Sequence, residues 1–350
     1  MSARLFFKNK PIVGLEISQT SAKVIAITPG SRLVTGYGAI DLNPSKMLNI
    51  NDMGIHLKTQ LRELFTKNIV GHMPSSHVAI SVATSRTFTR SLTLPRSAEG
   101  NLLEAIELEA EQYIPVSVSE LYLDHEVIGG NKDEIEVLLS AVPRLYVDAL
   151  IDVCNEIGLQ PLLLEPSIAS VARLIRRAEE GTLATVILDI GAEGSDIAVL
   201  DKSIRVTGGI DVGGHAMTEA IMKKLKVTHE AAHMLRTHNG LSVGPKQAAI
   251  RAALDPVFGK IIDETKKVMR YYTERLGQET KLEQLVIVGG GSNIPGIGDY
   301  FTENMIMPAR SASPWQVVEF GKLAPLSKQM KPRFITAIGL ALVDDKELWK

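Results

Sequence analysis

Two segments far apart in this chain repeat one pattern: an apolar run, a small polar turn and a second apolar run. The first copy is Pro11–Ile27, PIVGLEISQTSAKVIAI, and the second is Thr185–Leu200, TVILDIGAEGSDIAVL. Apolar runs separated by small turn residues are typical of a strand, a tight turn and a second strand. In each copy an acid, Glu16 or Asp189, stands two residues before the turn. A repeat with so long a period predicts two related lobes.

Two segments of small and apolar residues support this division. Pro166–Leu174, PSIASVARL, and Phe334–Leu342, FITAIGLAL, are both predicted helices with small residues on one face. Each follows one copy of the repeat and would cross toward the other lobe. We therefore expect an α/β fold with a first lobe at 1–178, a second lobe at 179–332, and a C-terminal helix at 333–350 that returns to the first lobe.

An α/β insert at about 75–160 belongs to the first lobe alone. Its predicted elements are strands at His77–Val82, Thr87–Leu94 and Ile135–Val142, and helices at 98–113 and 146–157. The predicted apolar stripe of the first of these helices is Leu103, Ile106, Ala110 and Tyr113. Cys154 lies on the apolar face of the second and is expected to be a buried thiol.

Composition limits the classes to which the chain can belong. Of 350 residues, 45% are hydrophobic and 22% charged, which is ordinary for a globular protein. A formal net charge of -2 gives no electrostatic signature of nucleic-acid binding, and we assign the basic groups Arg173–Arg177 and Lys223–Lys226 to solvated helix faces. The single cysteine fits a reducing compartment. Because Leu5–Phe7 and the other apolar runs are too short for a signal peptide or a membrane span, we expect a soluble cytoplasmic protein.

Both turns of the repeat are candidate phosphate sites. The backbone N–H groups of a tight turn of small residues converge on one point, where an anion can bind. The adjoining acids, Glu16 and Asp189, would hold a magnesium ion or its waters against the phosphates. Two buried hairpins with solvated turns are the alternative interpretation.

Two glycine-rich segments of the second lobe add to these candidates. The apolar run LVIV leads into Gly289–Gly291, where the lack of side chains lets a ligand lie directly on the backbone. Ile294 stands where the dinucleotide fingerprint requires its third glycine, which excludes that fingerprint. Gly213–Gly214 open a predicted helix, whose N-terminus can receive phosphate.

A zinc site at His229–His233, HEAAH, is a competing hypothesis, because this segment matches the H-E-x-x-H pattern of zinc proteases. The longer pattern fails, since Arg236 replaces its glycine and Asn239 replaces its third histidine. So short a pattern often occurs by chance.

Taken in order, these segments resemble the actin-like ATPase superfamily, which includes actin, the cell-division protein FtsA and the sugar kinases. The two phosphate segments of that superfamily are matched by Ile12–Ile27 and Ile187–Leu200, and its two connecting helices by Glu165–Leu174 and Ile335–Leu342. Its adenosine segment is matched by Leu285–Phe301. The resemblance implies an actin-like duplicated two-lobe fold of ribonuclease-H-like subdomains, with the insert as an α/β subdomain of the first lobe.

Within that superfamily, the insert is similar to that of the PilM family of type IV pilus assembly proteins. The similar residues are Leu94-Pro95, Glu104-Ala105-Ile106, Glu109-Ala110, Gln112-Tyr113-Ile114-Pro115, Asp124, Ala141, Gly158-Leu159-Gln160-Pro161 and Leu164-Glu165-Pro166. Actin and the sugar kinases lack this block at this position. The segment after Thr228 also falls where that family carries an acidic, alanine-containing helix, which argues against the zinc interpretation.

The resemblance implies a cytoplasmic adaptor at the inner membrane that binds ATP or ADP, with magnesium, between its two lobes. It also implies docking on the cytoplasmic N-terminal peptide of a PilN-like membrane protein, with pilus motor ATPases and self-association as further expected contacts. An active ATPase of the same fold, and an FtsA-like adaptor of cell division or of a type II secretion platform, are the alternatives.

The resemblance also assigns roles to single residues. Phosphate contacts fall on Ser18, Thr20, Ser21, Gly191, Gly213 and Gly214, and the adenosine would lie on Gly289, Gly290 and Gly291. Asp189 and Glu16 would position magnesium through water, and Glu165 would orient an attacking water.

Four positions depart from the family's pattern. Glu16 replaces an aspartate, and Ser18 replaces a glycine, so a left-handed backbone there would be strained. His233 stands where a glutamate normally holds the ribose, and Arg236 replaces a lysine near the base. We therefore expect a nucleotide binder with weak or no ATPase activity.

Overall fold

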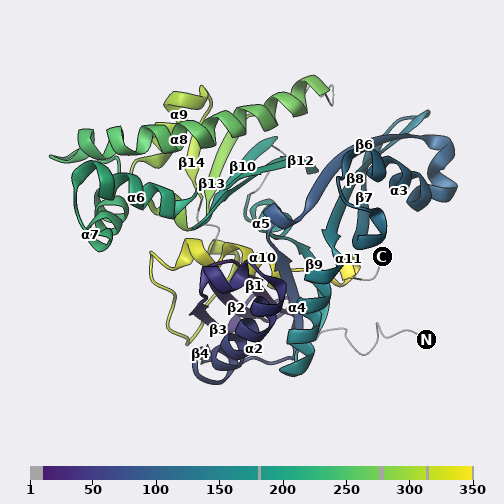
Figure 1. Ribbon diagram of the computed structural model, residues 1–350, viewed down its shortest axis with the longest axis horizontal. Coiled ribbons are helices and arrows are strands. Elements are labelled where there is room, and N and C mark those ends of the chain that lie inside the picture. The colour runs from purple at the N-terminus through teal and green to yellow at the C-terminus, as the bar shows by residue number, and fades with distance from the viewer. Residues whose placement is uncertain (1–10, 180–182, 276–279, 313–314, 349–350) are drawn as a thin grey trace. The chain divides into compact units, whose positions relative to one another are not determined.

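The chain forms two compact units in the computed structural model, which describes residues 11–179, 183–275, 280–312 and 315–348. The first unit contains the described residues of 1–180, 314–326 and 334–350, and the second unit those of 181–313 and 327–333 (Figure 1). Within the described ranges, the structure contains no helix that is both long and apolar enough to cross a membrane. The N-terminal run Leu5–Phe7 lies outside the described residues.

The first unit is built on a six-stranded sheet of order β4-β3-β2-β1-β5-β9. Its strands are β1 (Val13–Ile17), β2 (Ser21–Ile27), β3 (Val34–Asp41), β4 (Ile69–Gly71), β5 (His77–Val82) and β9 (Gln160–Pro166). Strands β1 to β4 pair antiparallel, whereas β5 pairs parallel with both β1 and β9. The predicted first hairpin is therefore confirmed as β1 and β2.

The second unit repeats this topology in a five-stranded sheet of order β12-β11-β10-β13-β14. Its strands are β10 (Thr185–Ile190), β11 (Ser195–Asp201), β12 (Ser203–Ile210), β13 (Gln284–Val288) and β14 (Ala309–Ser311). An antiparallel meander of β10, β11 and β12 is again extended by two parallel strands beside the first strand of the hairpin. The duplicated α/β fold that the repeat predicts is confirmed.

Helices cover both faces of the first sheet. Because side chains alternate along β1, Val13, Leu15 and Ile17 pack into a core with α2 (Ile50–Lys67) and α4 (Arg144–Glu156). Cys154 of α4 is buried in this core, as predicted, and burial raises the pKa of its thiol to about 12.

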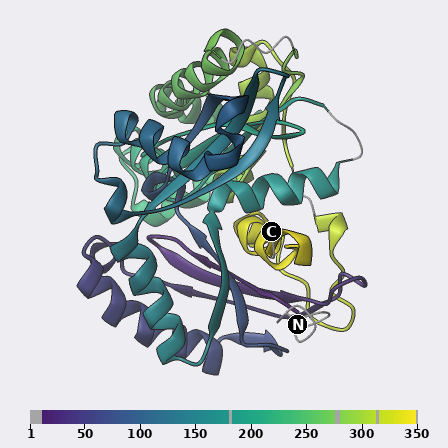
Figure 2. The ribbon, with the colours of Figure 1, turned by 90° about the vertical axis from the view of Figure 1, so that its right-hand side faces the viewer.

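The opposite face of the first sheet packs against the helix α10 (Ile335–Ala341), which also contacts α5 (Ser167–Ala178) (Figure 2). The chain then continues into α11 (Asp345–Leu348), so the C-terminal segment contains a second short helix. Residues 315–326 also pack with the first unit, although the sequence places them in the second lobe: Leu33 bridges to Glu319, and the Tyr37 hydroxyl donates to the Ala324 carbonyl at 2.8 Å.

The helices of the second unit pack with its sheet around a separate core. They are α6 (Gly214–Leu225), α7 (His229–Met234), α8 (Gln247–Arg270) and α9 (Ile297–Met305). Residues Val186, Leu188 and Ile190 of β10 point into this core. Asp189, which alternates with them, therefore lies on the other face of the strand.

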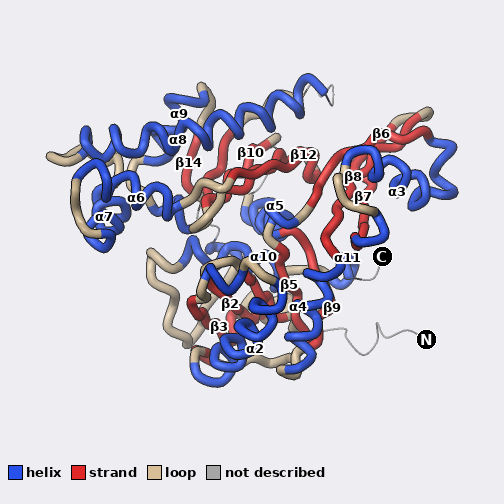
Figure 3. The backbone as a smooth tube through the Cα atoms, in the orientation of Figure 1, coloured by secondary structure: helices blue, strands red, loops and turns tan. Residues whose placement is uncertain are grey.

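A third sheet, of order β6-β8-β7, lies within the range expected for the insert (Figure 3). It consists of β6 (Phe88–Pro95), β7 (Leu121–Gly130) and β8 (Glu134–Pro143), and α3 (Leu102–Tyr113) packs on it. The sequence analysis did not predict β7. Strand β5, although it lies within 75–160, joins the six-stranded sheet instead.

The predicted apolar stripe of α3 is wrong at both of its ends. Leu103 is 52% exposed and Tyr113 is 47% exposed, whereas Ile106 and Ala110 are buried as predicted. Leu102 packs against the sheet in place of Leu103. The Tyr113 ring lies instead beneath the Arg90 guanidinium, whose central carbon is 3.7 Å from the ring centroid. This cation–π contact gives an exposed aromatic ring a partner outside the core.

Glycines allow α10 to touch its neighbours backbone to backbone. A Cβ on Gly14 of β1 would lie 2.0 Å from the Ala337 carbonyl oxygen. On the other side of the helix, a Cβ on Gly339 would lie 2.0 Å from the Ser170 carbonyl oxygen in α5. Any side chain at either glycine would therefore force the helix away from its partner.

We expect Gly339→Ala to lower the free energy of unfolding of the first unit by about 2–3 kcal/mol, because the new methyl overlaps backbone that cannot move alone. The matched control is Gly54→Ala in α2, where the nearest atom to the added methyl is 4.0 Å away. That change should be neutral or stabilise by up to ~1 kcal/mol. Urea unfolding of both variants checks this, and equal stability would contradict it.

Candidate functional site

The turn between β1 and β2 is closed by the side chain of Ser18. Its backbone N–H donates to the Ser21 carbonyl at 2.9 Å, and its hydroxyl donates to the same oxygen at 3.0 Å. The backbone N–H of Ser21 donates back to the Ser18 hydroxyl at 3.1 Å. Ser18 does not adopt a left-handed backbone, so the strain expected at this position is absent.

The three residues expected to contact phosphate in this turn differ in how accessible they are. Ser21 is only 3% exposed and its hydroxyl lies 3.3 Å from that of Ser18, so it is occupied within the turn. Thr20 is partly exposed, and its carbonyl accepts from the Leu42 backbone at 2.9 Å. Ser18 and Thr20 thus remain the more accessible of the three.

The turn after β10 repeats this geometry with a glycine. The backbone N–H of Gly191 donates to the Gly194 carbonyl at 2.9 Å, matching the bond from Ser18 to Ser21. The helix α6 begins directly on this turn, because the Gly214 N–H donates to the Gly191 carbonyl at 3.0 Å and the His215 N–H to the Ala192 carbonyl at 2.9 Å. The predicted phosphate segment and helix N-terminus therefore lie together.

The glycine segment after β13 joins the same edge of the sheet. Strand β13 pairs parallel with β10 and places Val288 opposite Asp189. Gly289 follows with φ of 79°, and a Cβ there would lie 2.1 Å from the Asp189 Oδ1. Gly290–Asn293 then forms a short 3-10 helix. The second unit thus brings Asp189, the turn after β10, the start of α6 and the predicted adenosine segment together at the carboxyl ends of parallel strands, where ligands of α/β sheets bind.

His233 and Arg236 lie beside this edge. His233 is exposed in the last turn of α7, and Arg236 lies in the π-helical segment Leu235–Asn239 and is 7% exposed. One Arg236 Nη lies 3.3 Å from the His233 Nδ1. Burial and the nearby Arg236 charge lower the pKa of His233, so the imidazole is neutral at pH 7 and can accept this bond.

A buried lysine was missed by the sequence analysis. Lys23 of β2 is 5% exposed and forms an ion pair with the Glu16 Oε1. The other carboxylate oxygen of Glu16 is buried and has no hydrogen-bond partner among the described residues. The signal available in the sequence was a single charged residue within the otherwise apolar strand SAKVIAI.

The acids near the two turns could hold a magnesium ion only if phosphate and water supplied most of the ligands of the metal. Among the described residues, no group of three or more His, Cys, Asp or Glu side chains could hold a metal. Mg²⁺ commonly binds through one or two carboxylates together with water and phosphate oxygens. Of the two expected acids, Glu16 is paired with Lys23, and Asp189 lies beside Gly289 at the start of the predicted adenosine segment.

Glu165 lies in register with Glu16 across the first sheet. Strand β5 places Ser81 opposite both residues, so the two glutamates are two strands apart at the same level. Glu165 is, however, 9% exposed, and both of its oxygens accept from Arg173, at 2.5 and 2.6 Å. Its carboxylate is occupied by an internal ion pair rather than turned toward solvent.

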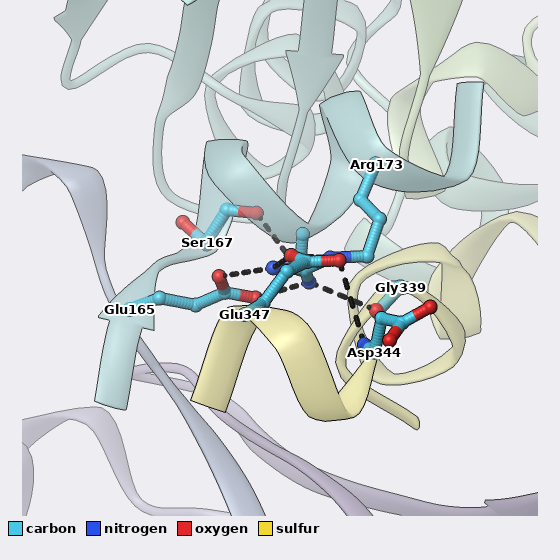
Figure 4. A network of polar contacts seen from close by, with 7 residues as sticks. Glu165, Ser167, Arg173, Gly339, Asp344 and Glu347 are labelled. Carbon is cyan, nitrogen blue, oxygen red and sulfur yellow. Dashed lines mark hydrogen bonds and ion pairs between the residues drawn. The ribbon is translucent and has the colours of Figure 1, made fainter. Parts of the chain in front are cut away.

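Arg173 holds several elements of the first unit together (Figure 4). It is 8% exposed, which corrects its assignment to a solvated helix face. Besides Glu165, it donates to the Glu347 carboxylate of α11 at 2.8 Å and to the Gly339 carbonyl of α10 at 3.0 Å. Although burial alone would lower it, the contacts with Glu165 and Glu347 raise the pKa of Arg173, so it stays a cation.

The model of the family described as "Type IV pilus assembly protein PilM" matches residues 14–344. The chain belongs to the PilM family. A chain of the solved PilM-PilN type IV pilus biogenesis complex superposes with a TM-score of 0.78 and 21% identity, over 95% of this chain and 98% of that one. This likeness extends over nearly all of both chains, and the actin-like fold inferred from the sequence is confirmed.

More distant structures share the fold of this PilM-family chain. The ethanolamine utilization protein EutJ from Carboxydothermus hydrogenoformans has a TM-score of 0.57 at 14% identity, over 95% of this chain and 90% of that one. MreB5 of Spiroplasma citri bound to ADP has the same TM-score and identity, over 96% and 97%. The cell division protein FtsA of Borreliella burgdorferi is 25% identical over 184 residues, which are 47% of this chain and 43% of FtsA.

We expect Glu165→Gln to lower the free energy of unfolding by about 3 kcal/mol, because it leaves Arg173 buried without its main counterion. The matched control is Glu347→Gln on the same arginine, where the carboxylate side chain is 36% exposed and the loss should stay below ~1 kcal/mol. Denaturant unfolding measures both. If Glu165→Gln leaves stability unchanged, the ion pair is not structural and the water-orienting role regains support.

Proposed function

We propose that this chain is a nucleotide-binding adaptor of type IV pilus assembly that docks on the cytoplasmic N-terminal peptide of a PilN-like inner-membrane protein. The observation that carries the proposal is the PilM family match, which runs across both units and the insert. The similar solved structure is a PilM–PilN complex, which supports a PilN-like partner. Attachment to the inner membrane through this partner, contacts with pilus motor ATPases and self-association are part of the same proposal.

The proposed nucleotide is ATP or ADP, with magnesium. The similarity to MreB5 bound to ADP supports this choice, as does the gathering of Asp189, Gly191 and Gly289 at one edge of the second sheet. Ser18 and Thr20 would contact phosphate from the first unit. Magnesium, when bound, would neutralise phosphate charge, and Asp189 would hold its water shell.

Weak or absent ATP hydrolysis follows from the occupied carboxylates. Glu165 is held by Arg173, and Glu16 is held by Lys23, so neither is free to activate a water in this conformation. An active ATPase of the same fold is the alternative. Phosphate release that disappears in Asp189→Asn would favour that alternative.

The partial match to FtsA favours a second candidate, an adaptor of cell division. An adaptor of a type II secretion platform is a further alternative. Location of the tagged protein in cells separates these: a pilus adaptor should follow the PilN-like protein, whereas a division adaptor should follow the division site.

We expect isothermal titration of the full chain with a PilN-like N-terminal peptide to give saturable heat, because the bound peptide would bury apolar surface and form hydrogen bonds with the chain. A scrambled peptide of the same composition is the control and should give none. Absence of heat both with and without ATP would overturn the peptide-docking proposal.

We expect Asp189→Asn to weaken ATP binding in magnesium about tenfold, because the variant keeps the shape of the side chain but loses the charge that holds the metal's waters. In EDTA the variant and the wild type should bind ATP equally. The control is Glu219→Gln, an exposed position on α6. An equal loss with and without magnesium would contradict a metal-linked role.

A further inference from the structure

The insert is strongly acidic, although the chain as a whole is nearly neutral. Residues 88–143, from the start of β6 to the end of β8, contain eleven Asp and Glu and three Lys and Arg, a net charge of -8. Because the whole chain carries -2, the remaining residues carry +6. Each copy of the chain therefore has an acidic part and a basic part, which can attract one another between copies.

Helix α3 concentrates this acidic charge on the face that is turned away from the insert sheet. The exposed residues of this outward face follow the spacing i, i+3, i+4 and i+7, and they are Glu104, Glu107, Leu108 and Glu111. Leu108 is 65% exposed. None of the three glutamates forms an ion pair with a residue that the structure describes. The outward face thus has an apolar residue and three charges without partners.

The charges of this face are unfavourable within α3 itself. Glu107 follows Glu104 at i+3 and Glu111 follows Glu107 at i+4, and like charges at such spacings destabilise a helix. Glu111 also lies in the last turn, which contains no basic residue and where the helix end carries partial negative charge. A basic partner would relieve both effects and would remove Leu108 from water.

The C-terminal half of α8 carries the complementary pattern. At the same spacing of i, i+3, i+4 and i+7, it exposes Asp263, Lys266, Lys267 and Arg270. Lys266 and Arg270 form no ion pair with a described residue. Lys267 contacts Glu264 at 3.2 Å, in an exposed pair of the kind that contributes little. The aliphatic stems of these basic side chains can cover an apolar residue while their charges reach carboxylates.

We propose that the outward face of α3 in one copy docks on the C-terminal half of α8 in a second copy of this chain. The proposal rests on the self-association included in the proposed function, and it names the two surfaces that meet. Because these surfaces differ, the contact is heterologous, and it joins copies into a ring or an open chain unless two copies exchange it reciprocally. One pair of helices makes a small interface, so the association should be weak and reversible.

The experiment is sedimentation velocity of the full chain over a range of protein concentrations. Wild-type protein should associate in about 0.05 M NaCl and dissociate in about 0.5 M NaCl, because added ions screen exposed charges. Two charge-reversal variants test the surfaces separately. They are Glu107→Lys with Glu111→Lys on α3, and Lys266→Glu with Arg270→Glu on α8. Each should weaken the association about 10-fold or more, because like charges then face each other.

An equimolar mixture of the two variants tests whether the two surfaces meet each other. In the mixture the reversed α3 faces the reversed α8, and the native α3 faces the native α8, so association should return. The matched control is Asp124→Lys with Glu126→Lys, which makes the same change of charge on β7. These residues alternate with Leu121 and Leu123, which pack against α3, so they lie on the other face of the sheet. The control should associate as the wild type does.

Wild-type protein that stays monomeric in low salt overturns the proposal. Association that neither reversal weakens also overturns it, since another surface then carries the contact. Weakening in both variants without recovery in the mixture means that the two surfaces do not meet, and has the same consequence. Circular dichroism shows whether each variant folds. If a reversal does not fold, the neutral pairs Glu107→Gln with Glu111→Gln and Lys266→Gln with Arg270→Gln replace it, and each should weaken association.

Titration of the same variants with the PilN-like N-terminal peptide separates this proposal from the proposed function. All variants should bind the peptide as the wild type does. Peptide binding that only the α3 variant loses would assign this face to the peptide and would rule out docking of a second copy there. If no sample binds the peptide, while association follows the charges as expected, peptide docking fails and the contact between copies stands.

Discussion

The parallel pairing of β1 with β5, and of β10 with β13, decides where the chemistry of this chain can lie. In each unit the first strand of an antiparallel hairpin carries a parallel strand on its other side. Parallel neighbours end at the same edge of a sheet, so the hairpin turn and the loop after the parallel strand meet there. Gly289, which is distant from Asp189 in the sequence, becomes its neighbour for this reason.

The buried cations Lys23, Arg173 and Arg236 differ in the side chains that contact them. In the first unit, Lys23 and Arg173 each form an ion pair with a glutamate to which the family resemblance assigns a role at the bound nucleotide. The cost of burying each charge is offset inside the protein, which strengthens the fold and leaves those acids less available to a ligand. In the second unit, the Arg236 guanidinium lies against Gly214 at the start of α6 and makes a 3.3 Å contact with His233. The first unit thus offsets the charges of Lys23 and Arg173 with its own glutamates.

Much of the fold could be predicted because it depends on local pattern. The hairpin β1–β2, strand β5 and helix α4 follow from apolar runs and turn residues that act over a few neighbours. The stripe of α3 was misjudged at Leu103 and Tyr113, because an amphipathic pattern does not reveal which of two adjacent apolar residues meets the sheet. Strand β7 was missed since its run of charged and small residues, LYLDHEVIGG, has a weak apolar signal.

The sequence by itself determined the duplication, the placing of small residues at both turns and the membership of an α/β class, because each rests on short-range periodicity. Only the tertiary structure decided the partners of the charged residues. From the sequence, Arg173 was assigned to a solvated helix face. In the structure it is paired with Glu165 of β9, which precedes it in the chain, and with Glu347 of α11, which follows it. The family resemblance places Arg236 near the base of a nucleotide, and only the structure shows that its guanidinium is buried against Gly214. A charge is stabilised or left unpaired by atoms distant in the chain, and no local pattern records which of them the fold brings near.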